Sequence, residues 1–152
     1  MRTTITTALT ALVVTAGLAA ASAPAAAAPA EPRGGYVATI EILGGPPGGP
    51  EGAPNEQFRV QLIERQDIQD AFVVLRSDDS SYGKHINGMI VRTPSRYNPG
   101  YNWHLDPRDV AFHERSWETC DGQPSFLEAD WWNSERFCPW FGKVVKMERV
   151  RR

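Results

Sequence analysis

Two cysteines, Cys120 and Cys138, follow a leader typical of exported proteins, and together they constrain the fold more than any other feature. A thiol pair that leaves the reducing cytoplasm is expected to oxidise. We therefore expect one disulfide that closes a loop in the last third of the chain. The alternative is a pair of free buried thiols. Zinc is disfavoured because a structural zinc site takes about four ligands, which two cysteines alone cannot supply.

The first thirty residues are interpreted as a secretory signal peptide, residues 1–30. Arg2 gives a short positive start, residues 5–21 form an apolar run, and small residues lead to a preferred cleavage site after Ala30. The apolar run is too short and too weakly hydrophobic to hold a bilayer, and no second such run follows it. We expect a secreted, extracellular protein without a membrane partner.

Removing these 30 residues from 152 leaves 122, the size of one compact domain over residues 31–152. Because Arg2 is lost with the leader, 15 basic residues remain against 18 acidic residues, a net charge of −3. Such a domain has no general attraction to nucleic acid or to anionic lipid. The exception is the C-terminal end, where five of the last ten residues are basic: Lys143, Lys146, Arg149, Arg151 and Arg152.

The first half of the domain predicts a hairpin followed by a helix. Residues 36–42 are rich in β-branched side chains and residues 58–62 alternate between apolar and polar, so both are expected to be strands. The Gly/Pro-rich residues 44–56 between them can support neither helix nor strand. Apolar residues spaced at i, i+3, i+4 and i+7 then predict an amphipathic helix over residues 66–77, followed by a turn over 78–83.

The second half predicts three more strands and a short helix. The helix would begin at Pro124, with Ser125 and Glu128 in the spacing of a capping box. Phe112 and Trp117 have opposite parity, so burying both would require a bulge near Glu114. The strands are expected over residues 85–93, around residues 110–112, and over residues 143–150.

These elements predict an α+β fold with one antiparallel sheet. With the first strand set aside, their order is β-α-β-β-α-β, which favours a ferredoxin-like arrangement with two helices on one face of the sheet. The predicted disulfide would hold the end of the fourth strand, the short helix and the start of the last strand together.

Five motifs in order resemble a family of small domains that is common in secreted bacterial and fungal proteins. The family is named for a slime-mould calmodulin-binding protein, and the chain resembles a secreted bacterial member of it from Tyr36 to Val150. The resemblance implies the family label but no chemistry for any residue. The motifs lie at residues 85–91, 97–100, 103–107, 118–122 and 137–140.

The family label makes calmodulin a possible partner, and one stretch of the chain superficially fits its targets. Trp140, Val144 and Met147 are spaced as the apolar anchors of a basic amphipathic helix. However, Gly142 and two consecutive valines disfavour a helix. The alternative, which we favour, is a closing strand with a charged end.

No residue pattern predicts a catalytic site, a metal site or a cofactor. His104 and Asp106 lie two apart and could serve a small hydrolase, but no spacing typical of a metal site or a serine hydrolase occurs. We instead expect His104 to hydrogen-bond a loop carbonyl and Asp106, which precedes Pro107, to open a turn.

The loop at residues 94–107 is the better candidate for binding, because it carries Tyr97, Tyr101 and Trp103 next to His104. The alternative is that these rings simply cover the sheet. A second aromatic pair, Trp131 and Trp132, lies in the predicted short helix, where adjacent residues cannot both face inward. One of the two should therefore be exposed.

Together these features predict a secreted, non-catalytic binding module, with an unknown protein, peptide or carbohydrate ligand bound by its aromatic loops. Two alternatives remain open. One is an extracellular proteinase inhibitor that presents residues 44–56 or 94–107 as a rigid loop. The other is the small hydrolase that uses His104 and Asp106.

Overall fold

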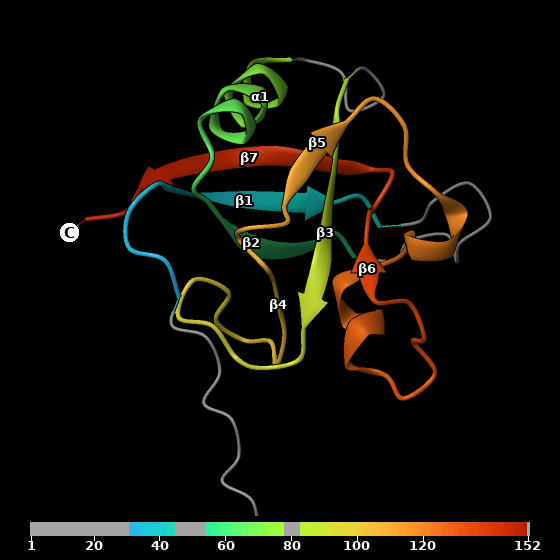
Figure 1. Ribbon diagram of the computed structural model, residues 1–152. Coiled ribbons are helices and arrows are strands. Elements are labelled where there is room, and N and C mark those ends of the chain that lie inside the picture. Colours follow the sequence, from blue (N-terminus) through green and yellow to red (C-terminus); the bar gives the residue numbers. More distant parts are fainter. Residues whose placement is uncertain (1–30, 45–53, 78–82, 152) are drawn as a thin grey trace, which may run out of the picture.

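A computed structural model describes residues 31–44, 54–77 and 83–151 of the chain (Figure 1). The predicted signal peptide, most of the Gly/Pro-rich loop and most of the predicted turn at 78–83 lie outside these residues. Within the described part, no helix is long and apolar enough to cross a membrane.

The first sheet has three antiparallel strands in the order β2-β1-β7. The predicted hairpin is confirmed, since β1 (Tyr36–Ile42) pairs with β2 (Glu56–Leu62), and Ile40 lies opposite Phe58. Strand β7 (Gly142–Arg149) pairs with the other side of β1. The closing strand is therefore confirmed, and the basic stretch is not a calmodulin-target helix.

One face of this sheet is apolar and is covered by the rest of the molecule. The helix α1 (Arg65–Arg76) matches the predicted helix, and its buried side chains include Ala71 and Val74. Strand β3 (His85–Val91) crosses in front of the first sheet, and β5 (Ala111–His113) lies between it and α1 (Figure 1). The core forms between these layers.

The second sheet is built entirely around β3. Strand β4 (His104–Leu105) pairs with the end of β3, β5 pairs with its start, and β6 (Arg136–Phe137) pairs with its middle. The described residues therefore form two sheets and one α-helix, whereas the ferredoxin-like prediction requires a single antiparallel sheet with two helices on one face. That part of the fold prediction is wrong.

The predicted second helix is also wrong. Its residues form a short 3₁₀-helix, η2 (Pro124–Glu128), and a second 3₁₀-helix, η1 (Glu118–Cys120), precedes it. Ser125 and Glu128 do not cap η2, because their polar groups bond Glu56 and Asn102 instead.

The predicted disulfide is confirmed between Cys120 and Cys138, which are 18 residues apart with their Cα atoms 5.1 Å apart. The bulge that would bury Trp117 does not form, because β5 ends at His113 and Trp117 follows outside the strand. Trp117 is 55% exposed and its ring lies against that of His113. Of Phe112 and Trp117, only Phe112 is buried.

Candidate functional site

The predicted binding loop lies along the free edge of β2, and its central ring is not available to a ligand. Trp103 is only 1% exposed. Its ring lies 5.6 Å from those of Phe58 and Phe137, in the middle of the core. For Trp103, the alternative that the ring covers the sheet is therefore confirmed.

Two further residues of this loop complete the edge of β2. The Asn98 side chain accepts a hydrogen bond from the backbone N of Arg59 at 2.8 Å and donates one to the carbonyl of Trp103 at 3.0 Å. The Tyr101 hydroxyl donates to the carbonyl of Gln57 at 3.1 Å. Since residues two apart in a strand direct their backbone groups the same way, the loop satisfies the groups that an edge strand leaves unpaired. Sequence reasoning missed Asn98.

The other predicted loop residues have structural contacts of their own. Tyr97 is half-buried, and the guanidinium of Arg96 lies 4.6 Å from the centre of its ring. His104 Nδ1 lies 2.7 Å from the carbonyl oxygen of Thr93, as expected for a loop contact. Whether Tyr97, Tyr101 or His104 also binds a ligand stays a prediction.

The residues of the proposed hydrolytic pair have bonds to other groups, His104 to the carbonyl of Thr93, and whether the pair serves a hydrolase stays a prediction. Asp106 opens a turn, as predicted: its carboxylate accepts a hydrogen bond from the backbone N of Arg108 at 3.0 Å. Its carbonyl accepts a second from Val110 at 3.1 Å. In the described ranges, no three or more His, Cys, Asp or Glu residues are grouped as a metal site.

Among the described residues, one exposed pair of aromatic rings lies on the segment that the disulfide closes. We call Phe126 and Trp131 the aromatic platform; their ring centres are 5.2 Å apart. Trp131 is 63% exposed, whereas its neighbour Trp132 is 9% exposed and lies beneath it, with ring centres 6.1 Å apart. The prediction that one tryptophan of this pair is exposed is confirmed. Of the two neighbours in η2, Leu127 is buried and Phe126 is exposed.

The platform rests on a rigid base. A Cβ atom added to Gly122 would lie 2.9 Å from Trp132 and 3.0 Å from Phe126, so the backbone there touches both rings. The indole N of Trp132 donates to the carbonyl of Ser134 at 2.9 Å. The disulfide and a hydrogen bond of 2.8 Å from the backbone N of Cys138 to the carbonyl of Cys120 hold the ends of the segment together.

Two carboxylates tie η2 to the rest of the domain. Glu56, at the start of β2, accepts hydrogen bonds from the backbone N and hydroxyl of Ser125 at 2.7 and 2.6 Å. Glu128 accepts one from the backbone N of Asn102 at 2.7 Å. The platform is thus fixed both to β2 and to the loop at residues 94–107, which covers the edge of β2.

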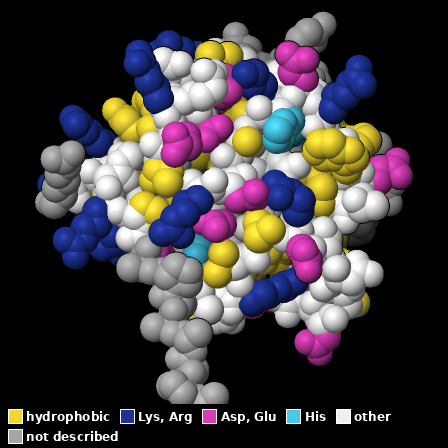
Figure 2. Space-filling view, viewed as in Figure 1, with side chains coloured by type: hydrophobic (Ala, Val, Ile, Leu, Met, Phe, Trp, Pro, Cys, Tyr) yellow, Lys and Arg dark blue, Asp and Glu magenta, His cyan; other side chains and the backbone are white. Residues whose placement is uncertain are grey.

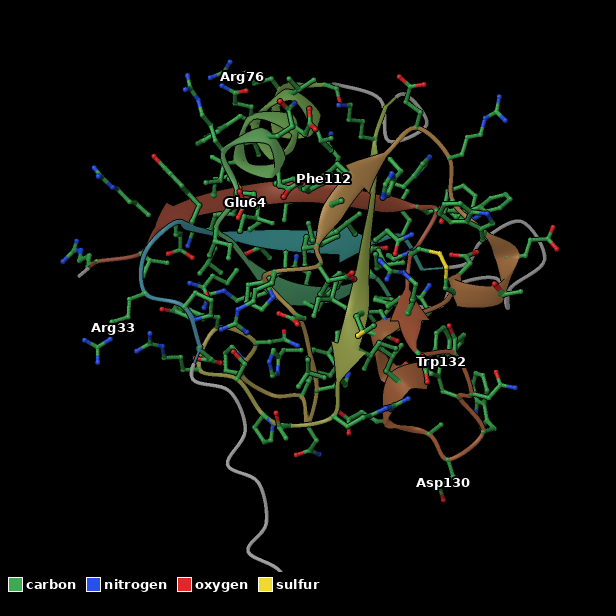
Figure 3. All side chains as sticks on the ribbon, viewed as in Figure 1. Arg33, Glu64, Arg76, Phe112, Asp130 and Trp132 are labelled. Atoms are coloured by element: carbon green, nitrogen blue, oxygen red, sulfur yellow. A yellow bond between two sulfur atoms is a disulfide. The ribbon has the colours of Figure 1, made fainter. Side chains whose placement is uncertain are left out.

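The segment that carries the platform is acidic in sequence, although the guanidinium of Arg92 reaches it and donates a hydrogen bond to the carbonyl of Leu127. Residues 118–135 contain five acidic residues and no Lys, Arg or His. Asp130 projects from the tip of this segment, while Trp132 lies nearer the sheet (Figure 3). Burial raises the pKa of Asp121, although hydrogen bonds from the backbone N–H groups of Trp140 and Gly122 oppose the rise. Glu118, Glu128 and Glu135 complete the set.

A hollow of about 520 Å³ lies on the polar face of the first sheet, but the charged side chains that line it are already paired. Arg59 forms an ion pair of 2.9 Å with Glu148, and Lys146 forms one of 3.2 Å with the same carboxylate. Because these charges neutralise one another, this surface offers less unpaired charge to a ligand than the segment around the platform does.

Comparison with known proteins gives one family. The profile of the N-terminal domain of the calmodulin-binding protein 74 family matches residues 50–151, which include every described element except β1. No curated protein and no solved structure matches the chain significantly. The family match agrees with the resemblance stated above.

Proposed function

The chain belongs to the calmodulin-binding protein 74 N-terminal domain family, and from this premise we propose that it is a secreted, non-catalytic module that binds a cationic peptide segment. The ligand is the side-chain surface of an arginine- or lysine-containing protein or peptide. The aromatic platform, Phe126 and Trp131, makes the central contact.

One observation carries this proposal: an exposed, rigidly supported ring pair lies within a segment of five acidic and no basic residues. Exposed tryptophan faces attract guanidinium and ammonium groups, and carboxylates nearby add ion pairs to the same ligand. A neutral sugar could stack on the rings but would gain nothing from the net charge. A cationic peptide uses both features.

The support beneath the rings also favours binding. Gly122, Trp132 and the disulfide hold the platform in one arrangement before a ligand arrives. A preorganised surface avoids the entropy cost of ordering rings on binding. A disulfide at this position is compatible with an oxidising compartment, which supports the proposed secretion.

Calmodulin binding through the basic C-terminal stretch is not part of the proposal. Of the three proposed anchors, Val144 is fully buried and Met147 packs against the core. Freeing them would require β7 to leave the sheet.

Isothermal titration of the domain with a short peptide of alternating arginine and leucine tests the proposal. We expect one binding site whose affinity falls steeply when NaCl is raised from about 0.05 to 0.5 M, because salt screens the ion pairs. A matched peptide of alternating glutamate and leucine should not bind. Binding of a soluble neutral glucan in place of the arginine peptide would contradict the proposal.

A further inference from the structure

A group of arginines surrounds a hollow at the opposite side of the molecule from the platform. The hollow has a volume of about 600 Å³ and is lined by Arg33, Gly34, Arg96, Val150 and Arg151. An adjoining hollow of about 550 Å³ shares Gly34, Val150 and Arg151 and adds Arg149. These residues are distant in sequence and are brought together by the pairing of β1 with β7.

The backbone around Arg33 is held in a fixed shape. The side-chain amide of Gln61, which is buried, donates to the carbonyls of Pro32 and Gly34 at 2.8 and 2.9 Å, one on each side of Arg33. The next residue, Gly35, has a positive φ of 83° and lies against the backbone of Leu62, where a Cβ atom would be 2.1 Å from its carbonyl oxygen. Arg33 therefore projects from a braced turn.

Arg96 and the end of β7 are fixed as well. The Arg96 guanidinium donates to the Tyr97 hydroxyl at 2.6 Å and forms an ion pair of 3.2 Å with Glu31. The backbone N of Val150 donates to the carbonyl of Gly35 at 3.0 Å, which positions Arg151 beside the turn.

The charge around the hollow is largely uncompensated. Glu31 pairs with Arg96, but Arg33, Arg149 and Arg151 form no ion pair with any described residue. Four arginines thus line the two adjoining hollows, and among the described residues only Arg96 of the four forms an ion pair, in a chain whose formal net charge is −2. Basic side chains gather at this side of the molecule, where β7 ends, and Arg33 extends outward there (Figures 2 and 3).

We infer that this arginine hollow binds a ligand carrying two or more adjacent phosphate groups. Guanidinium groups bind phosphate oxygens through paired hydrogen bonds, and several guanidiniums that line one hollow favour a multiply charged anion over a single carboxylate. The ligand would displace Glu31 from Arg96. The Tyr97 ring, against which Arg96 stacks, would keep that guanidinium oriented.

Isothermal titration of the full domain with inorganic pyrophosphate tests the inference. We expect one site, with affinity reduced roughly tenfold in the Arg33→Ala and Arg151→Ala variants because each removes a charge-assisted contact. Arg96→Lys keeps the charge but loses the paired hydrogen bonds and should weaken binding similarly. The matched control is Arg115→Ala, an exposed arginine outside the hollow, which should bind as the unchanged protein does.

Two outcomes would overturn the inference. The first is an absence of pyrophosphate binding, or an equal loss in Arg115→Ala, which would indicate general charge rather than a site. The second is cosedimentation with phosphatidylglycerol vesicles without pyrophosphate binding, which would assign the arginines to a lipid surface. Vesicle binding that pyrophosphate competes away would instead support the hollow, with a lipid headgroup as the phosphate source.

Discussion

Asn98 closes the free edge of β2 through a hydrogen bond of 2.8 Å from the backbone N of Arg59 to its side-chain oxygen. The same side chain, 1% exposed, donates to the carbonyl of Trp103. One buried amide therefore joins the edge strand to the loop that covers it. Removing the amide would leave a buried donor and a buried acceptor without partners.

The Asn98→Ala variant should lose about 2–4 kcal/mol of unfolding free energy, because each buried unpaired group costs about 1–3 kcal/mol. Urea denaturation followed by circular dichroism measures this loss. The control is Asn102→Ala, whose exposed side chain bonds Glu128 and whose loss should cost less than about 1 kcal/mol. Equal effects of the two substitutions would contradict the role of Asn98.

Tyr101 should make the stability of the domain depend on pH in the alkaline range. Burial, followed by the charges of Glu56 and Glu128, raises its pKa above the ordinary value of 10.0. The folded state then holds this proton more tightly than the unfolded state, so stability falls as pH rises through about 10 toward the folded pKa. Ionisation would also remove the hydroxyl proton donated to Gln57.

The Tyr101→Phe variant isolates this effect. It should be less stable than the unchanged protein at pH 8, and the difference should narrow by about pH 11, because Tyr101 ionises more readily in the unfolded state and Phe cannot ionise. Thermal melts at the two pH values provide the measurement. A stability difference that is the same at both pH values would show that the hydroxyl proton of Tyr101 does not contribute to stability.

The Cys120–Cys138 disulfide should supply a large part of the stability. Closing a loop of 18 residues contributes about 3 kcal/mol in the chain-entropy description. Guanidinium denaturation with and without dithiothreitol should differ by about this amount. The unfolding free energy of the double variant Cys120→Ala/Cys138→Ala should not change when dithiothreitol is added.

The two tryptophans of the platform segment should differ in their effect on stability. Trp132→Ala removes a buried ring and should cost about 3–5 kcal/mol. Trp131→Ala removes an exposed ring and should change stability by less than about 1 kcal/mol. Melting temperatures of both variants test the distinction, and a large loss for Trp131→Ala would mean that its ring is structural.

The sequence predicted the elements whose residues form regular patterns. Alternation along residues 58–62 predicted β2, apolar spacing predicted α1, and two cysteines behind a predicted leader predicted the disulfide. These patterns are local or covalent, so they can be recognised before the fold is known. Each element was found within a few residues of its expected position.

Which aromatic and basic residues gather on the candidate binding surfaces could not be predicted, because that depends on which loop packs against which edge. Trp103 and Trp131 both lie among turn residues, yet one is buried and the other is exposed. The difference arises from Asn98 and Tyr101, which draw the first loop onto β2. Likewise, Arg33, Arg96 and Arg151 meet only after β1 and β7 have paired.

The most direct test of the proposed function compares the binding of the arginine–leucine peptide by Trp131→Ala and Trp117→Ala, using isothermal titration. Both variants remove an exposed tryptophan, but only Trp131 belongs to the aromatic platform. We predict an affinity about tenfold lower for Trp131→Ala, consistent with a cation–π contact of about 1–2 kcal/mol, and no change for Trp117→Ala. Unchanged affinity in Trp131→Ala, or an equal loss in both variants, would contradict the account.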